Sequence, residues 1–98
     1  MAPGEDEHTV VITIVRVELS SDSASSVDAA CNDIISSMKR IGASYGGPIP
    51  MPKRRENGRT VHTRVVEIDS DPRAVSWLKS YVCPAGTEMR CTVVEKRS

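Results

Sequence analysis

Aromatic residues are scarce in this 98-residue chain, which has no Phe, one Trp and two Tyr. A surface that stacks single-stranded bases on aromatic rings is therefore not expected. The cysteines are three in number, Cys31, Cys83 and Cys91, and they show neither Cys-x-x-Cys nor His-Cys spacing. This pattern argues against a disulfide framework and against a zinc site, so we interpret them as reduced thiols that are buried or idle. We expect no metal and no cofactor.

Long apolar runs are also missing. No stretch approaches the ~20 apolar residues that a membrane-spanning helix needs. The acidic start, Glu5-Asp6-Glu7, is the opposite of a secretory or mitochondrial targeting segment. The length suits a single domain that can bury a core without disulfides. We therefore predict a cytoplasmic protein without membrane contact, with a flexible acidic leader over residues 1–7 and one domain over residues 8–98.

The formal net charge is zero, but the two halves of the chain differ in sign. Residues 1–50 carry three Lys or Arg against seven acids, and residues 51–98 carry ten against six, so the halves have net charges of −4 and +4. An anionic partner would therefore meet the second half. Lys39 and Arg40, at the end of a predicted helix, would add to that positive region.

The first half alternates between a strand pattern and a helix pattern. Residues 8–19 are dense in Val and Ile, which is typical of a central strand. Residues 20–26 form a Ser-rich turn with capping residues, and apolar side chains then recur at steps of three and four up to Gly42, as in an amphipathic helix. We expect the core side of this helix to carry Val27, Ala30, Cys31, Ile34, Ile35, Met38 and Ile41, and its solvent side to carry Asp28, Asn32, Asp33, Ser36, Ser37 and Lys39.

The segment Gly47-Pro48-Ile49-Pro50-Met51-Pro52 is followed at once by Lys53-Arg54-Arg55. Proline at every second position fixes φ and keeps the chain extended, so this stretch is neither a helix interior nor a regular central strand. One interpretation is a rigid arm that holds three cations at a fixed point for a polyanion. The other is an edge strand that ends in a solvated basic turn.

The second half repeats the alternation of strand and helix. A strand over residues 43–51 leads into the proline arm, and Asn57-Gly58 is a strong hairpin signal before a strand over residues 59–69. Ser70-Asp71-Pro72 is typical of a helix start, with Val75, Leu78, Tyr81 and Val82 as its apolar stripe. Pro84 and Gly86 end this helix, and residues 88–96 form a last strand.

The predicted order is strand, helix, strand, strand, helix, strand. This order is that of a ferredoxin-like split βαβ sandwich of the α+β class, in which a four-stranded antiparallel sheet carries two helices on one face.

Catalysis has little support in the residues. His8 and His62 are the only histidines, and neither has Cys, Ser and acid residues at a spacing that suggests a catalytic group. The glycines do not form a phosphate-binding loop, because the strand, helix and Lys-Ser or Lys-Thr of such a site are missing. We predict that the protein is not an enzyme and takes no small-molecule substrate.

RNA binding has better support. The basic residues of the expected hairpin crowd a short turn, and His62 and Arg64 lie two apart on the following strand, so their side chains share a face. Such groups contact phosphate and sugar without reading bases. The alternatives are a soluble turn for the arginine cluster and a cross-strand packing residue for His62. The candidate RNA-binding residues are Lys39, Arg40, Lys53, Arg54, Arg55, Arg59, His62 and Arg64.

Several of these motifs resemble the S-ten family of small-subunit ribosomal proteins. Gly42-Ala43 with the proline arm is similar to the family's helix-ending turn and its Gly-Pro-apolar-Pro-apolar-Pro run. Residues 62–68 (HTRVVEI) resemble its His-x-Arg strand, and residues 85–93 (AGTEMRCTV) its closing turn and last strand. The resemblance runs from about His8 to Val94 and implies ribosomal RNA and neighbouring small-subunit proteins as partners.

The chain departs from the family at the hairpin. Family members have a much longer excursion between the proline arm and the His-x-Arg strand, whereas only Lys53 to Val61 lie between them here. Members also usually have Thr at the position of Lys53, and most are clearly basic. Two functions follow as alternatives: a structural ribosomal protein that docks on small-subunit RNA, or a non-ribosomal or organelle-ribosome protein-interaction module with the same fold.

Overall fold

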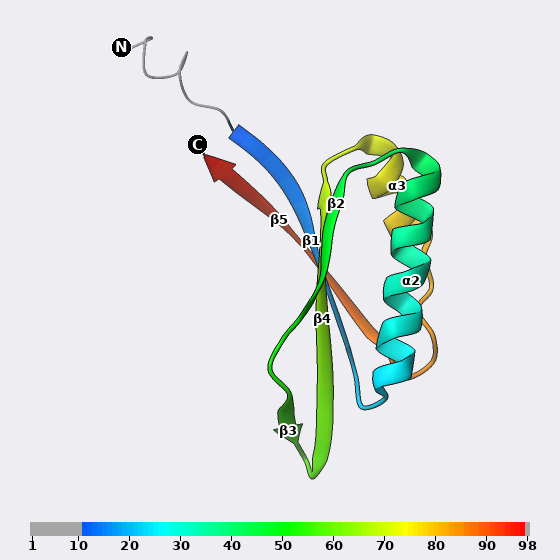
Figure 1. Ribbon diagram of the computed structural model, residues 1–98, viewed down its shortest axis with the longest axis vertical. Helices are drawn as coiled ribbons and strands as arrows, with labels where there is room; N and C mark the ends of the chain where they lie inside the picture. Colours follow the sequence, from blue (N-terminus) through cyan, green and yellow to red (C-terminus); the bar gives the residue numbers. More distant parts are fainter. Residues whose placement is uncertain (1–10, 98) are drawn as a thin grey trace.

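The computed structural model describes residues 11–97, with side chains from 12 to 96 (Figure 1). The acidic leader and His8 lie outside the described residues. The elements follow in the order β1 (Val11–Ser21), α2 (Ala24–Ile41), β2 (Tyr45–Pro50), β3 (Arg54–Glu56), β4 (Arg59–Asp69), α3 (Pro72–Ser80) and β5 (Glu88–Arg97). No helix in this range is long and apolar enough to cross a membrane.

The strands form an antiparallel sheet in the order β2-β4-β1-β5, and the short β3 pairs with β4 beyond the end of β2. The central strand β1 pairs with β4 on one side, where Val17 faces Val66, and with β5 on the other, where Val17 faces Cys91. Both helices lie on one side of the sheet (Figure 1). The predicted split βαβ fold is confirmed, and β3 adds a fifth strand to the four that were expected.

Helix α2 has a defined residue at each end. The hydroxyl of Ser23 accepts a hydrogen bond from the backbone N–H of Ser26, so Ser23 is the N-cap. Gly42 ends the helix in the left-handed region with φ of 86°, and its N–H donates to the carbonyl of Met38. Lys39 and Arg40 occupy the last turn, where the helix dipole favours positive charge.

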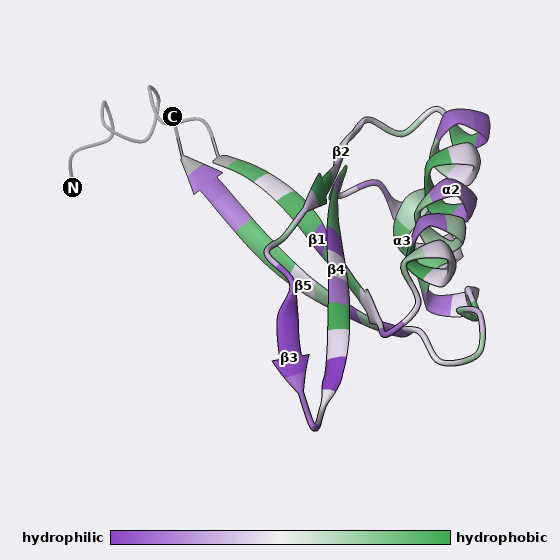
Figure 2. Ribbon diagram, turned by 60° about the horizontal axis from the view of Figure 1, so that its bottom comes forward, coloured by the Kyte–Doolittle hydropathy of each residue, from purple (hydrophilic) through white to green (hydrophobic). Residues whose placement is uncertain are grey.

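The core lies between the sheet and α2. The odd-numbered side chains of β1, Val15, Val17 and Leu19, point at the helices, and Ile34 and Met38 meet them from α2. Apolar and polar positions follow one another along β1, β4 and β5 (Figure 2), as expected for a sheet covered on one face. The predicted helix face is confirmed at Val27, Ala30, Cys31, Ile34 and Met38, all of which are buried.

Three predicted positions were wrong. Ile35 is only half-buried, while Ser37, which was expected on the solvent side of α2, is buried. Both lie at the border of the apolar face, where periodicity alone does not assign a side. Helix α3 ends at Ser80, so Val82 is 84% exposed and does not belong to the helix stripe.

The proline segment is an edge strand. Strand β2 pairs with β4 on one side, and its register shifts between Gly46 and Ile49. Gly47 has φ of 106°, and a Cβ at this position would lie 2.8 Å from the backbone oxygen of Val65. Only glycine fits such a close approach without strain. Of the two interpretations of the segment, the structure has the edge strand that leads into an exposed basic turn.

Candidate nucleic-acid interface

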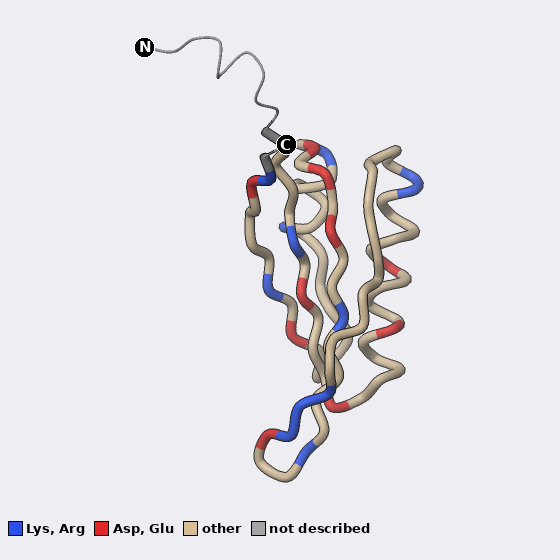
Figure 3. The backbone as a smooth tube through the Cα atoms, turned by 60° about the vertical axis from the view of Figure 1, so that its left-hand side comes forward, with Lys and Arg blue, Asp and Glu red and all other residues tan. Residues whose placement is uncertain are grey.

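Strands β3 and β4 form a hairpin that extends beyond the start of α2 (Figure 1). Asn57 and Gly58 make its two-residue turn with positive φ values of 52° and 77°. A type I′ turn requires positive φ at both central residues, and Asn-Gly is its preferred sequence. The predicted hairpin is therefore confirmed, and it places the basic residues of the turn region at one end of the molecule (Figure 3).

The four cations of this hairpin differ in their surroundings. Arg54 lies 3.4 Å from Glu56, and Arg59 lies 3.6 Å from Asp22 at the end of β1. Lys53 and Arg55 are exposed and form no ion pair with any residue between 11 and 97. A phosphate can therefore approach Lys53 and Arg55 without displacing a carboxylate.

The pairing register distributes the hairpin side chains over two faces. Arg54 is opposite Val61 and Glu56 is opposite Arg59, so these four side chains share one face. Arg55 is opposite Thr60 and points to the other face, which continues along β4 to His62 and Arg64. The hairpin therefore presents cations on both of its sides and not on a single basic face.

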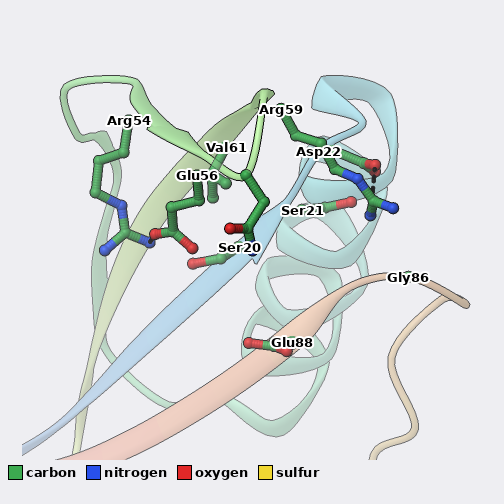
Figure 4. Close-up of a pocket in the computed structure, with 10 residues that line it drawn as sticks. Ser20, Ser21, Asp22, Arg54, Glu56, Arg59, Val61, Gly86 and Glu88 are labelled. Atoms are coloured by element: carbon green, nitrogen blue, oxygen red, sulfur yellow. Dashed lines mark ion pairs between the residues drawn. The ribbon is translucent and has the colours of Figure 1, made fainter.

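An open cleft of about 500 Å³ lies between the hairpin and the adjoining ends of β1 and β5 (Figure 4). Arg54 and Arg59 line it together with three acids, Asp22, Glu56 and Glu88. Because the acids outnumber the arginines and two of them are already paired, this cleft is not suited to hold a phosphate. Lys53 and Arg55 do not line this cleft, so an anion can reach them from outside it.

Arg64 faces the helices. In the register of β4 with β1 it is opposite Leu19, whose side chain is in the core. Its Nε lies 3.6 Å from Oδ1 of Asp28 on α2, and its Nη1 donates to the carbonyl of Thr63 at 3.1 Å. The side chain is only 21% exposed. Arg64 therefore links β4 to α2.

His62 shares the face of Arg64, as predicted, and is half-buried. Its Nδ1 is buried and has no hydrogen-bond partner among the described residues. Sequence parity does not say which face of β4 the helices cover, and the register with β1 puts both side chains on the covered face. Their position agrees with the packing role that was the alternative for His62.

Lys39 and Arg40 are not part of the hairpin surface. They lie in the last turn of α2, at the end of the molecule opposite to β3 (Figures 1 and 3). The guanidinium of Arg40 is 3.4 Å from the hydroxyl of Ser37. The predicted set of cations is thus divided between the two ends of the fold.

Two contacts of Tyr81 were not predicted. The phenol of Tyr81 donates a 2.8 Å hydrogen bond to Asp33, and the ring of Tyr81 stacks on Trp77 with centroids 4.8 Å apart. The spacing of four residues between Trp77 and Tyr81 is a sequence signal for contact between the two rings. The pairings of Tyr81 with Asp33 and of Arg64 with Asp28 join residues far apart in the chain and have no local signature.

The three thiols are free. Burial raises the pKa of Cys31 and Cys83, and partial desolvation raises the pKa of Cys91, whose side chain is otherwise exposed. For Cys31 the carboxylate of Asp28 adds to this effect, while the nearby Arg64 opposes it. A raised pKa keeps a thiol protonated and unreactive, in agreement with the interpretation of idle cysteines. In the described part of the chain no group of three or more Cys, His, Asp and Glu could hold a metal ion.

Comparisons with a family model and with individual proteins point to the same family. The sequence model of Ribosomal protein S10p/S20e matches residues 16–61, from the middle of β1 to the start of β4. The small ribosomal subunit protein uS10 of Picrophilus torridus is 28% identical over 96 residues, which cover 80% of this chain and 93% of that protein. Those of Thermoplasma acidophilum and Brachyspira pilosicoli are 26% and 27% identical and also cover most of both chains.

The Picrophilus protein has positions that this chain lacks. Because 80% of this 98-residue chain is about 78 residues, an alignment over 96 positions leaves about 18 positions of the Picrophilus protein without a counterpart here. The split βαβ fold, the order of the motifs and the matches to these relatives together support the identification of this chain as a member of the S-ten family of ribosomal proteins.

Proposed function

We propose that this chain is a structural protein of the small ribosomal subunit, which binds ribosomal RNA and neighbouring ribosomal proteins in the cytoplasm. The observation that carries the proposal is the family membership, combined with an exposed hairpin whose Lys53 and Arg55 have no acidic partner among the described residues. The role is one of assembly and positioning and requires no catalysis.

The RNA contact is assigned to the β3–β4 hairpin. Lys53 and Arg55 contact phosphates directly, and Arg54 and Arg59 contribute once RNA competes with Glu56 and Asp22 for their guanidinium groups. Because the hairpin is short and lacks aromatic residues, it contacts the backbone at the surface of the RNA and does not read unpaired bases. His62 and Arg64 support the hairpin from the helix side of β4.

Lys39 and Arg40 do not belong to the RNA contact of the hairpin; any RNA contact that they make is a separate one. They lie at the far end of α2, so a single RNA helix that contacts the hairpin does not reach them without running along the whole molecule. The alternative of an interaction module outside the small subunit is not favoured by the relatives, which are small-subunit proteins by name.

Sedimentation of a tagged copy through sucrose gradients tests the proposal. The protein should move with small subunits and stay with them after a high-salt wash. A variant that lacks the charges of Lys53 and Arg55 should be released at a lower salt concentration than the wild type. The matched variant at Lys39 and Arg40 should stay bound to a higher salt concentration than the hairpin variant. Recovery only in the top fractions would contradict the ribosomal role.

A further inference from the structure

The two edges of the sheet are built differently. On the β2 edge, Pro48 and Pro50 lack backbone donors and the register shifts between Gly46 and Ile49. Prolines and bulges of this kind prevent a further strand from pairing. The other edge, β5, has ten residues without proline or glycine, and its register with β1 runs unbroken from Arg97 opposite Val11 to Glu88 opposite Ser20.

Strand β5 also lacks cover from the helices over most of its length. Only Met89 packs against the core; Cys91 and Thr92 are exposed and Val93 is 67% exposed. Figure 1 shows β1 and β5 running together away from the two helices. No strand in residues 11–97 pairs with the outer edge of β5. A long, regular edge strand with an exposed apolar side chain at Val93 is a template for the addition of another strand, provided that its charged side chains find partners of opposite sign.

We propose that β5 pairs with β5 of a second copy of this chain, antiparallel and about a twofold axis at Thr92. A twofold axis perpendicular to the sheet keeps each side chain on its own face, so even positions can oppose only even positions and odd only odd. The centre of the pairing must therefore fall on a residue, and the middle of β5 offers Cys91, Thr92 or Val93.

The charges of β5 select Thr92 among these three. With the axis at Thr92, Glu88 of each copy lies opposite Lys96 of the other, and Cys91 lies opposite Val93 on the helix side. This arrangement covers the exposed Val93 and makes two pairs of opposite charge. Lys96 is 3.4 Å from Glu67 within its own chain, so it would lie between two carboxylates.

The other two registers are worse. An axis at Val93 places Arg90 opposite Lys96 twice, so like charges face each other, and it places Cys91 opposite Glu95. An axis at Cys91 places Glu88 opposite Val94 and leaves Lys96 beyond the end of the partner strand. Only the Thr92 register therefore combines a long ladder with complementary charge.

The inference goes beyond the ribosomal role and does not depend on it. It concerns the protein that is not docked, in which the two sheets join into one continuous sheet through β5. An interface limited to one strand edge lies at the small end of the range for specific association, so the dimer is expected to be weak and reversible.

Sedimentation velocity on the full-length protein tests the pairing at concentrations from about 10 µM to about 1 mM, a range that covers weak association. The wild-type protein should shift toward a dimer with rising concentration. Glu88→Lys and Lys96→Glu should each weaken dimerisation by about tenfold, because each places like charges opposite one another twice. The double exchange E88K/K96E should restore it. A monomer at every concentration would overturn the proposal, and so would a dimer on which the exchanges have no effect.

Cross-linking locates the axis. In a background with Cys83→Ser and Cys91→Ser, Thr92→Cys should form a disulfide-linked dimer under mild oxidation, since residues on the axis face each other closely enough for a disulfide. Glu95→Cys in the same background is the matched control, because the two copies of residue 95 lie far apart in this register. Equal cross-linking of the two variants would rule out the axis at Thr92.

Discussion

The guanidinium of Arg64 on β4 and the carboxylate of Asp28 on α2 form an ion pair at 3.6 Å across the edge of the core. The arginine belongs to the His-x-Arg strand, and the acid lies near the start of the helix that covers this strand. Because Arg64 is mostly enclosed while Asp28 is more than half exposed, the pair acts as a link between sheet and helix more than as a surface charge.

Removal of either partner of this pair should destabilise the fold. We expect Arg64→Met and Asp28→Asn each to lower the free energy of unfolding by about 1 kcal/mol, a value at the upper end for a partly exposed pair. The double variant should be little less stable than the worse single one, because the same interaction is missing in all three. Urea unfolding of the four proteins gives the coupling. Strict additivity would show that the pair contributes nothing.

The core side of α2 is tested at Ile34. Its side chain is fully buried, so Ile34→Ala should cost about 2 to 5 kcal/mol through reduced burial and the cavity left behind. Ile35→Ala is the matched control on the next residue, which is half-buried, and should cost clearly less. Equal effects of the two substitutions in denaturant melts would contradict the assignment of the helix face.

The close approach of β2 to β4 depends on Gly47. Gly47→Ala should destabilise by about 1 to 3 kcal/mol, because alanine is strained at φ of 106° and its Cβ would collide with the backbone oxygen of Val65. Gly46→Ala is the control, since a Cβ at Gly46 meets no atom within 4 Å. Thermal melts of both variants check the difference. An unchanged melting temperature of Gly47→Ala would contradict the close approach of β2 to β4 at Gly47.

The hydrogen bond between Tyr81 and Asp33 predicts a pH effect. Burial, together with this bond, raises the pKa of the Tyr81 phenol well above its usual value of about 10. A raised pKa in the folded state means that the bond contributes fully below the unfolded pKa and that its contribution falls as the pH rises above it. The wild type should therefore begin to lose stability at about pH 10, the usual pKa of a phenol, and continue to lose it as the pH rises toward the raised pKa.

Tyr81→Phe should lose less stability over that alkaline range, because it has no phenol to ionise at this position. At neutral pH the same variant should be less stable than the wild type by about 0.5 to 1 kcal/mol, the usual net contribution of one hydrogen bond. Unfolding free energies of both proteins across the range measure the difference. Parallel curves would contradict a raised pKa for Tyr81.

Much of the fold could be predicted because local signals agreed with each other. Gly42 at the end of α2, Asn57-Gly58 in the hairpin and Asp71-Pro72 at the start of α3 each fix a boundary by their own backbone chemistry. The start of α2 was placed too late, because the helix begins at Ala24, inside the predicted turn over residues 20–26. Strand β4 has the predicted bounds for the same reason. Ile35 was misplaced because tertiary packing decides residues at the border of a helix face, and Val82 because α3 already ends at Ser80.

The candidate site was less predictable than the fold. Parity correctly put His62 and Arg64 on one face, but which face meets the helices depends on the register with β1, where Arg64 is opposite Leu19. Two of the acids that pair with the cations, Asp22 and Asp28, come from the other half of the chain. Lys39 and Lys53 are only 14 residues apart in the sequence, which does not indicate that they lie at opposite ends of the molecule.

The most direct measurement of the ribosomal role is the salt dependence of binding to small-subunit ribosomal RNA. Replacement of Lys53 and Arg55 by Gln should weaken binding and flatten the slope of log affinity against log salt by about 0.7 to 0.9 for each phosphate that is no longer neutralised. The matched variant with Lys39 and Arg40 replaced by Gln should keep most of the slope, and all three proteins should unfold at the same denaturant concentration. An unchanged affinity and slope in the hairpin variant would contradict the assignment of the β3–β4 hairpin as the RNA contact.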